Sequence, residues 1–158
     1  MPPVRVRRQS YGWRPRSTLL SPSRWRFVDR LRSERPGWTK ANGTQNNWFS
    51  MSIGMPPGCL ATASFAAGGR LRHELYIDRG TPEECKAPFD ALQDQRQAVE
   101  AAYGKELKWE RLDTNKASRI ADYRPGKVDN ADEHDGYIDW FINAGDRLRS
   151  TIAAIPIG

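Results

Sequence analysis

The stretch from Trp48 to Pro125 determines the fold class of this chain. It reads WFSMSIG (48–54), CLATASFAAGGRLRHELYIDRG (59–80), AVEAAYG (98–104) and KELKWERLDTNKASRIADYRPG (105–126). Apolar and polar residues alternate in 48–54 and 70–78, as in half-buried strands, and Gly68-Gly69 is typical of a hairpin turn. These patterns predict three consecutive antiparallel strands over 48–54, 59–67 and 70–78.

The next segment carries helix signals and then two more strand patterns. Thr81-Pro82-Glu83-Glu84 has the spacing of a capping box with proline at the first helical position. Apolar residues recur at helical spacing as far as Tyr103, and Gly104 is a helix stop. We therefore expect a helix over 82–103, which Pro88 should kink or whose start it should delay. Residues 106–112 and 117–124 are predicted to be strands.

Helices are also predicted at both ends of this region. Ser21-Pro22 begins a first helix over 22–34, which stops at Pro36-Gly37. Asp129 is expected to cap a final helix that carries Tyr137 and Phe141. The resulting order, α-β-β-β-α-β-β-α, predicts an α+β fold with a five-stranded, mainly antiparallel sheet and helices packed on one face.

Length and composition indicate a single domain, which we place over 22–154. The chain has 158 residues and is 38% hydrophobic. No apolar run approaches the roughly 20 residues of a membrane span, so no membrane partner is expected. Cys59 and Cys85 form no CxxC pair, and the N-terminus lacks the apolar core of a secretory signal. Reduced thiols and a cytoplasmic location are the expectation.

The positive charge is concentrated at the N-terminus. The formal net charge is +6, yet residues 1–24 hold six arginines and no acid. Subtracting these six from the 25 Lys and Arg leaves 19, which equals the number of Asp and Glu. Residues 1–21 are predicted to be a basic, disordered leader, because their prolines disfavour helix and central strand. Such an arm can attract phosphates nonspecifically.

The element order also matches the start of restriction-type nucleases, but the residues do not. Those sites need an acid near the second strand and an acid-x-Lys triplet on the third, which together surround Mg²⁺. The second predicted strand has no acid, and neither Glu74-Leu75-Tyr76 nor Asp78-Arg79-Gly80 ends in lysine. No catalytic residue, metal ligand or cofactor is therefore predicted.

The two histidines fit structural roles. His73 alternates with Leu71 and Leu75, which favours a buried, hydrogen-bonded histidine. His134 lies among acids in the first turn of the last predicted helix, where negative charge suits the helix dipole.

The polar side of the strands is the main functional candidate. Alternation places Arg70, Arg72, Glu74, Tyr76 and Asp78 on one side of the third strand, and Arg119 and Tyr123 project from the fifth in the same sense. Arginine interleaved with aromatic rings can stack on bases and pair with phosphates. The candidate nucleic-acid-binding residues are Trp48, Arg70, Arg72, Tyr76, Arg119 and Tyr123. The alternative is a solvated face with ion pairs such as Arg72 with Glu74 and Lys108 with Glu110, or a face that a helix covers.

Several ordered blocks of the chain resemble one family. RLRHELYIDRG, KAPFDALQDQRQAVEAAYGKELKWERL, KASRIADYRPG and YIDWFINAGDRLR are similar to the bacterial and archaeal domain-of-unknown-function family numbered 4268, over roughly residues 25–152. Pro88 departs from the apolar residue that the family usually places before FDAL. The resemblance implies a shared fold. It also implies an association with nucleases, since the family module often follows a nuclease-like region in longer proteins. It implies no catalytic residues.

Three functions follow as hypotheses. The favoured one is a non-catalytic accessory module of a nucleic-acid-processing or defence-type protein, which contacts DNA or RNA through the Arg/aromatic strand face and the basic leader. The second is a protein-interaction or homodimerisation module, whose partner is a nuclease-like protein or a second copy of the chain. The third is a divergent restriction-type nuclease.

Overall fold

The computed structural model describes residues 27–39 and 48–158. The predicted leader (1–21) and the predicted start of the first helix (22–26) lie outside these residues. Residues 27–34 are helical. The remaining elements are β1 (Trp48–Met51), β2 (Cys59–Ala66), β3 (Arg70–Ile77), α2 (Pro82–Gln93), α3 (Arg96–Tyr103), β4 (Lys108–Glu110), β5 (Ser118–Pro125), the short 3₁₀ helix η1 (Ala131–Glu133) and α4 (His134–Ala154). The α+β class and the order of elements are confirmed.

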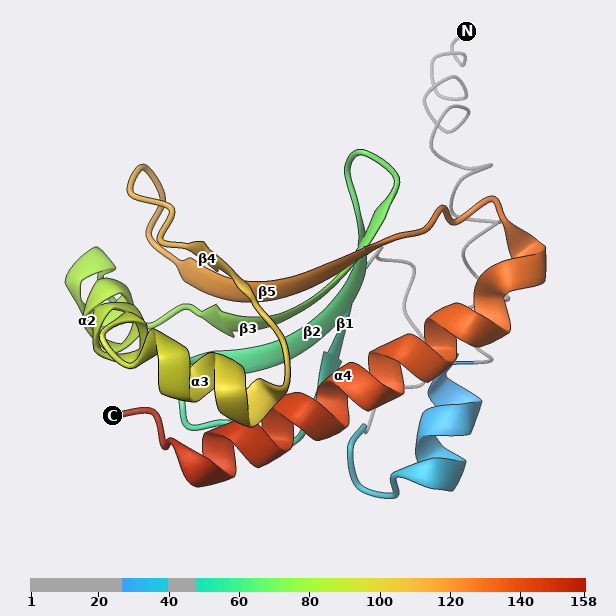
Figure 1. Cartoon of the computed structure of the whole chain (residues 1–158), viewed down its shortest axis with the longest axis horizontal. Coiled ribbons are helices and arrows are strands. Elements are labelled where there is room, and N and C mark those ends of the chain that lie inside the picture. Colours follow the sequence, from blue (N-terminus) through green and yellow to red (C-terminus); the bar gives the residue numbers. More distant parts are fainter. Residues whose placement is uncertain (1–26, 40–47) are drawn as a thin grey trace, which may run out of the picture.

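The five strands form one antiparallel sheet in the order β1-β2-β3-β5-β4. Residues directly opposite each other share a face of such a sheet. We call the side with Leu71, His73, Leu75 and Ile77 of β3, together with their partners on the other strands, the covered face. The side with Arg70, Arg72, Glu74 and Tyr76 and their partners is the open face. Figure 1 shows α2, α3 and α4 together on one side of the curved sheet.

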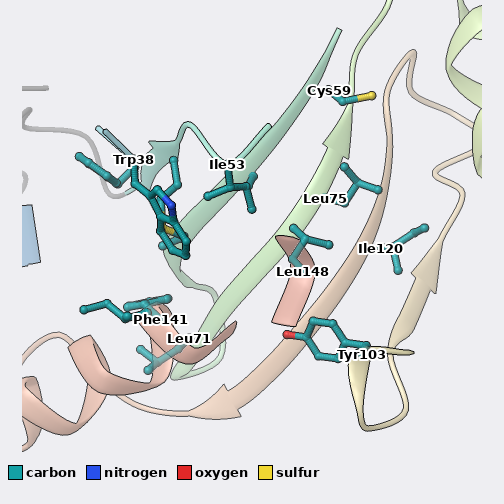
Figure 2. Close-up of a cluster of buried hydrophobic side chains, with 14 of the residues drawn as sticks. Trp38, Ile53, Cys59, Leu71, Leu75, Tyr103, Ile120, Phe141 and Leu148 are labelled. Carbon is teal, nitrogen blue, oxygen red and sulfur yellow. The ribbon is translucent and has the colours of Figure 1, made fainter. Parts of the chain in front are cut away.

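The hydrophobic core lies between the covered face and the helices. Leu71 and Leu75 of β3 are buried, and Phe141 and Leu148 of α4 pack in the same cluster (Figure 2). Phe27 lies 5.2 Å from Phe49 and 5.5 Å from Phe141 between ring centroids. These contacts connect the first helix, the edge strand and the last helix, so the ends of the described region join one core.

The capping box at Thr81 is confirmed, but the expected single helix is interrupted. Thr81 Oγ1 accepts the Glu84 N–H at 3.2 Å, and Glu84 Oε2 accepts the Thr81 N–H at 2.8 Å. The helix begins at Pro82, so the expected delay by Pro88 is wrong, and Pro88 lies buried inside α2. The break comes later, because the Gln95 N–H bonds to the Leu92 carbonyl. That bond spans three residues, and the chain leaves α-helical geometry there.

Other boundaries also differ from the expectation. The strand predicted over 106–112 is reduced to Lys108–Glu110. The strand predicted over 48–54 ends at Met51, because the Ser52 N–H donates to the Trp38 carbonyl at 2.6 Å. Asp129 does not cap the last helix. The 3₁₀ helix η1 comes first, and α4 then begins at His134 without a side-chain cap at Glu133. None of the helices that the structure describes is both long enough and apolar enough to cross a membrane.

Lys86 holds α2 against the loop between β4 and β5. Its side chain is buried, and Nζ donates to the carbonyls of Arg111, Leu112 and Ala117 at 2.6, 2.9 and 2.7 Å. Ser118 Oγ lies a further 3.1 Å away. A buried ammonium is stable only with such partners. The bonds fix the loop over 111–117, where Leu112 has a positive φ of 57°.

Candidate nucleic-acid interface

The sheet register brings five of the six candidate residues onto the open face. Arg72 lies opposite Tyr123, and Tyr76 lies opposite Arg119. Arg70 shares this side of β3. Trp48 pairs with Ser64 through the backbone, while its side chain lies outside the described part of the structure. Asp78, expected on the same side, follows the end of β3 and forms an ion pair with Lys116 at 2.8 Å.

Glu74 stands at the centre of the open face and is only 5% exposed. Thr62 Oγ1 donates to Glu74 Oε1 at 2.9 Å. Arg119 Nη1 donates to Glu74 Oε2 at 3.2 Å, and Arg72 Nε forms an ion pair with the same oxygen at 3.0 Å. Arg72 and Arg119 lie about four residues apart along the paired strands. Their guanidinium groups nevertheless contact the same carboxylate oxygen of Glu74. A buried carboxylate needs such partners to remain charged.

Glu110 extends this network to the edge strand. Its Oε1 lies 3.4 Å from Arg119 Nε, and its Oε2 accepts the Tyr123 hydroxyl at 2.7 Å. Burial, together with the hydrogen bond to Glu110, raises the pKa of Tyr123. The Arg70 guanidinium carbon lies 4.2 Å from the centre of the Tyr123 ring. Polar side chains of β2, β3, β4 and β5 are thereby connected across the open face.

The open face keeps an excess of positive charge. Arg70, Arg72, Arg119 and Lys108 share it with two acids, Glu74 and Glu110, in the observed register. Arg72 pairs with Glu74, as the solvated-face alternative predicts, and Arg119 pairs with both acids. Within the described residues, the salt bridges include no partner for Arg70 or Lys108. Two cations are thus left to attract an external anion.

The covered face holds a second polar group, which is enclosed. His73 lies opposite Asp122, whose carboxylate accepts the Tyr103 hydroxyl and pairs with Lys105 Nζ, both at 2.8 Å. Burial lowers the pKa of His73 to about 3. The pKa of Tyr103 is raised by burial and by the charge of Asp122.

The predicted burial of His73 is confirmed, but its hydrogen bonding is incomplete. Its Nε2 is buried and has no hydrogen-bond partner among the described residues. The ring borders a cavity of about 20 Å³, whose other lining residues include Leu75, Tyr103, Ile120 and Leu148 (Figure 2). This space is about that of one water molecule. His73 therefore acts as part of the packed core.

The remaining candidate groups are also buried and bonded locally. Cys59 and Cys85 are free, buried thiols, as core packing predicts, and burial raises the pKa of Cys59. His134 Nε2 lies 2.7 Å from the Val128 carbonyl oxygen. Residues 27–39 and 48–158 contain no group of three or more His, Cys, Asp or Glu that could hold a metal ion.

One family model matches this chain over residues 25–155, and its description is a domain of unknown function, DUF4268. The chain belongs to the DUF4268 family. The DUF4268 segment contains all six candidate residues and both acids of the open face. No curated protein and no solved structure matches the chain.

Sequence reasoning missed Thr62 as a member of the open-face network, and it paired Glu110 with the wrong cation. The expected partner of Glu110 was Lys108, whereas the structure pairs Glu110 with Arg119 across the strands. The position of Thr62 depends on the length of the hairpin loop. A turn of only Gly68 and Gly69 would place Thr62 opposite Leu75, whereas the observed loop over 67–69 places it opposite Glu74. Glu110 is harder to find. Its contact with Tyr123 depends on the pairing of β4 with β5, which lie at one edge of the sheet.

Proposed function

We propose that this chain is a non-catalytic accessory module of a nucleic-acid-processing or defence-type protein, and that its open face contacts DNA or RNA. The observation that carries the proposal is the arrangement of Arg70, Tyr123 and Arg72 on a sheet face opposite the helices, with more cations than acids around them. Arginine and tyrosine side chains on such a surface can pair with phosphates and stack on bases.

Two observations favour this function over its alternatives. A protein-interaction or homodimerisation surface usually has an apolar centre. Among the described residues, Leu60 is the large hydrophobic side chain that stands exposed, at 44%. A divergent nuclease would direct its acids towards a shared metal. Glu74 and Glu110 instead both face Arg119, which supports a role in positioning arginine.

The test is a salt-titrated binding assay with single-stranded DNA, duplex DNA and RNA. The reversal R70E/K108E changes the two open-face cations without ion pairs and leaves the contacts of Glu74 intact. We expect weaker binding and a less steep dependence on salt, because each lost phosphate contact reduces the slope of log K against log salt by about 0.7–0.9.

The control reverses a single charge on the helical side of the molecule, and R70E alone is the variant that matches it in charge. Arg149 is exposed on α4, and R149E should bind nucleic acid nearly as the wild type does. The proposal is wrong if the wild type binds none of the probes at low salt. It is also wrong if R70E/K108E binds as tightly as wild type.

A further inference from the structure

We infer that the open face recognises single-stranded nucleic acid and that an unpaired base stacks on the Arg70–Tyr123 pair. This inference rests on the function proposed above and adds the class of ligand. Its geometric basis is the guanidinium of Arg70, which lies 4.2 Å over the Tyr123 ring and belongs to an exposed residue. The ring supports one face of the planar cation, and the other face is available to a second planar group.

The neighbouring contacts hold this stack in place. Tyr123 is fixed through its hydroxyl, which donates to Glu110 at 2.7 Å. Arg70 Nε donates to the Ala67 carbonyl at 3.3 Å, which fixes the guanidinium from the hairpin side. A platform anchored at both members loses little conformational freedom when a base binds.

The charges beside the stack suit a phosphate backbone. Arg72 lies opposite Tyr123 in the register, and Lys108 lies opposite Ala121, two residues along β5. A strand that places a base on Arg70 can pass its phosphates over these cations. Bases of a duplex are stacked on each other and are not free for such a contact, so the arrangement favours an unpaired strand.

The experiment compares three DNA probes of equal length by fluorescence anisotropy at low salt. They are oligothymidine, an abasic oligomer with the same phosphates but no bases, and a blunt duplex. We expect oligothymidine to bind more tightly than either of the others. R70K keeps the charge but removes the planar group, and it should weaken oligothymidine binding by about fivefold or more while leaving the abasic probe unaffected.

Two further variants serve as controls. Y123F keeps the ring and should retain the preference for oligothymidine, whereas Y123L should lose it. R149K makes the same exchange of arginine for lysine on α4 and should change nothing. Melting temperatures of all variants check that they fold.

The outcomes separate this inference from the proposed function. Equal affinity for the abasic probe or the duplex, or an equal effect of R70K on all probes, shows attraction to phosphates alone. That result overturns the stacking inference and leaves the proposed function standing. Failure of every probe to bind at low salt overturns both.

Discussion

The two faces of β3 show two ways in which one strand becomes buried. Leu75 on the covered face is excluded from water by apolar contacts with the helices. Glu74, one residue earlier, is almost equally buried on the open face, where Thr62 and two arginines surround it. On the covered face burial stabilises the fold through apolar area, and on the open face charge neutralisation makes burial possible. The open face can therefore be firmly ordered and still remain polar.

The largest expected effect is a difference in unfolding free energy between substitutions of two neighbouring residues, Leu75 on the covered face and Tyr76 on the open face. L75A removes a buried side chain beside the cavity and should lower the free energy of unfolding by about 2–5 kcal/mol. Y76A removes a ring from the open face and should cost less than about 1 kcal/mol, the size of a cross-strand contact. Urea denaturation of both variants measures the difference. Similar losses would mean that the two faces are equally packed.

The second effect concerns the centre of the open face. E74Q keeps the shape of the side chain but removes the charge that Arg72 and Arg119 share. We expect a loss of about 1–3 kcal/mol, because hydrogen bonds to a buried charged group are replaced by weaker ones. The exposed Glu106 provides the control, and E106Q should stay within about 0.5 kcal/mol of wild type. If E74Q leaves the free energy of unfolding unchanged, the network does not stabilise the sheet.

The third effect is a pH dependence that belongs to the covered face. The pKa of His73 is lowered to about 3 in the folded protein, whereas an unfolded chain titrates near its ordinary value of 6.5. Between these values the unfolded state binds a proton that the folded state does not. Stability is therefore fully present above about pH 6.5 and decreases as the pH falls, by up to about 1.4 kcal/mol per pH unit.

Comparison with H73L isolates this contribution. Unfolding free energies measured at pH 7.5, 6 and 5 should fall more steeply for wild type than for H73L. Parallel curves would indicate that His73 is accessible to protons in the folded state. The range stops at pH 5 because Asp90 and Glu100, whose pKa values are lowered, contribute their own loss at more acidic pH.

The smallest effect is expected at a helix ion pair whose arginine is exposed. Arg96 and Glu100 are four residues apart on α3, with Nε and Oε1 at 3.3 Å. R96Q should cost about 0.3–0.5 kcal/mol, and less at high salt. Glu100 keeps its bonds to the Leu107 N–H and to Trp109 Nε1 in that variant. A loss above 1 kcal/mol would show that the Arg96 contact orders the turn that follows α3.

The sequence predicts the faces of the strands well, because alternation is a local property. Leu71, His73 and Leu75 are placed correctly by their spacing alone, and so are Arg72 and Tyr76 on the other side. The break between α2 and α3 was missed because Pro88 is the stronger local signal. The helix accommodates Pro88 and opens instead at the polar residues Asp94 and Gln95.

The contacts of the candidate site could be predicted only in part. Arg72 with Glu74 follows from their common side of β3. Arg119 reaches Glu74 only because β3 pairs with β5, and these two residues are 45 positions apart in the sequence. The stack of Arg70 on Tyr123 depends on the same pairing and on the rotamers of both side chains. Such contacts arise from the tertiary structure, and spacing in the sequence does not encode them.

The burial of Lys86 has a consequence for its chemical reactivity. An amine reacts with an acylating reagent only when the reagent can reach it, and the buried Lys86 Nζ donates to three carbonyl oxygens inside the protein. Lys108, by contrast, is exposed on β4. The rate at which an activated ester labels Lys86, followed by peptide mass spectrometry and compared with the rate at Lys108, therefore reports how often α2 and the loop over 111–117 separate. Labelling of Lys86 thus measures local opening at the edge of the sheet where β4 and β5 pair.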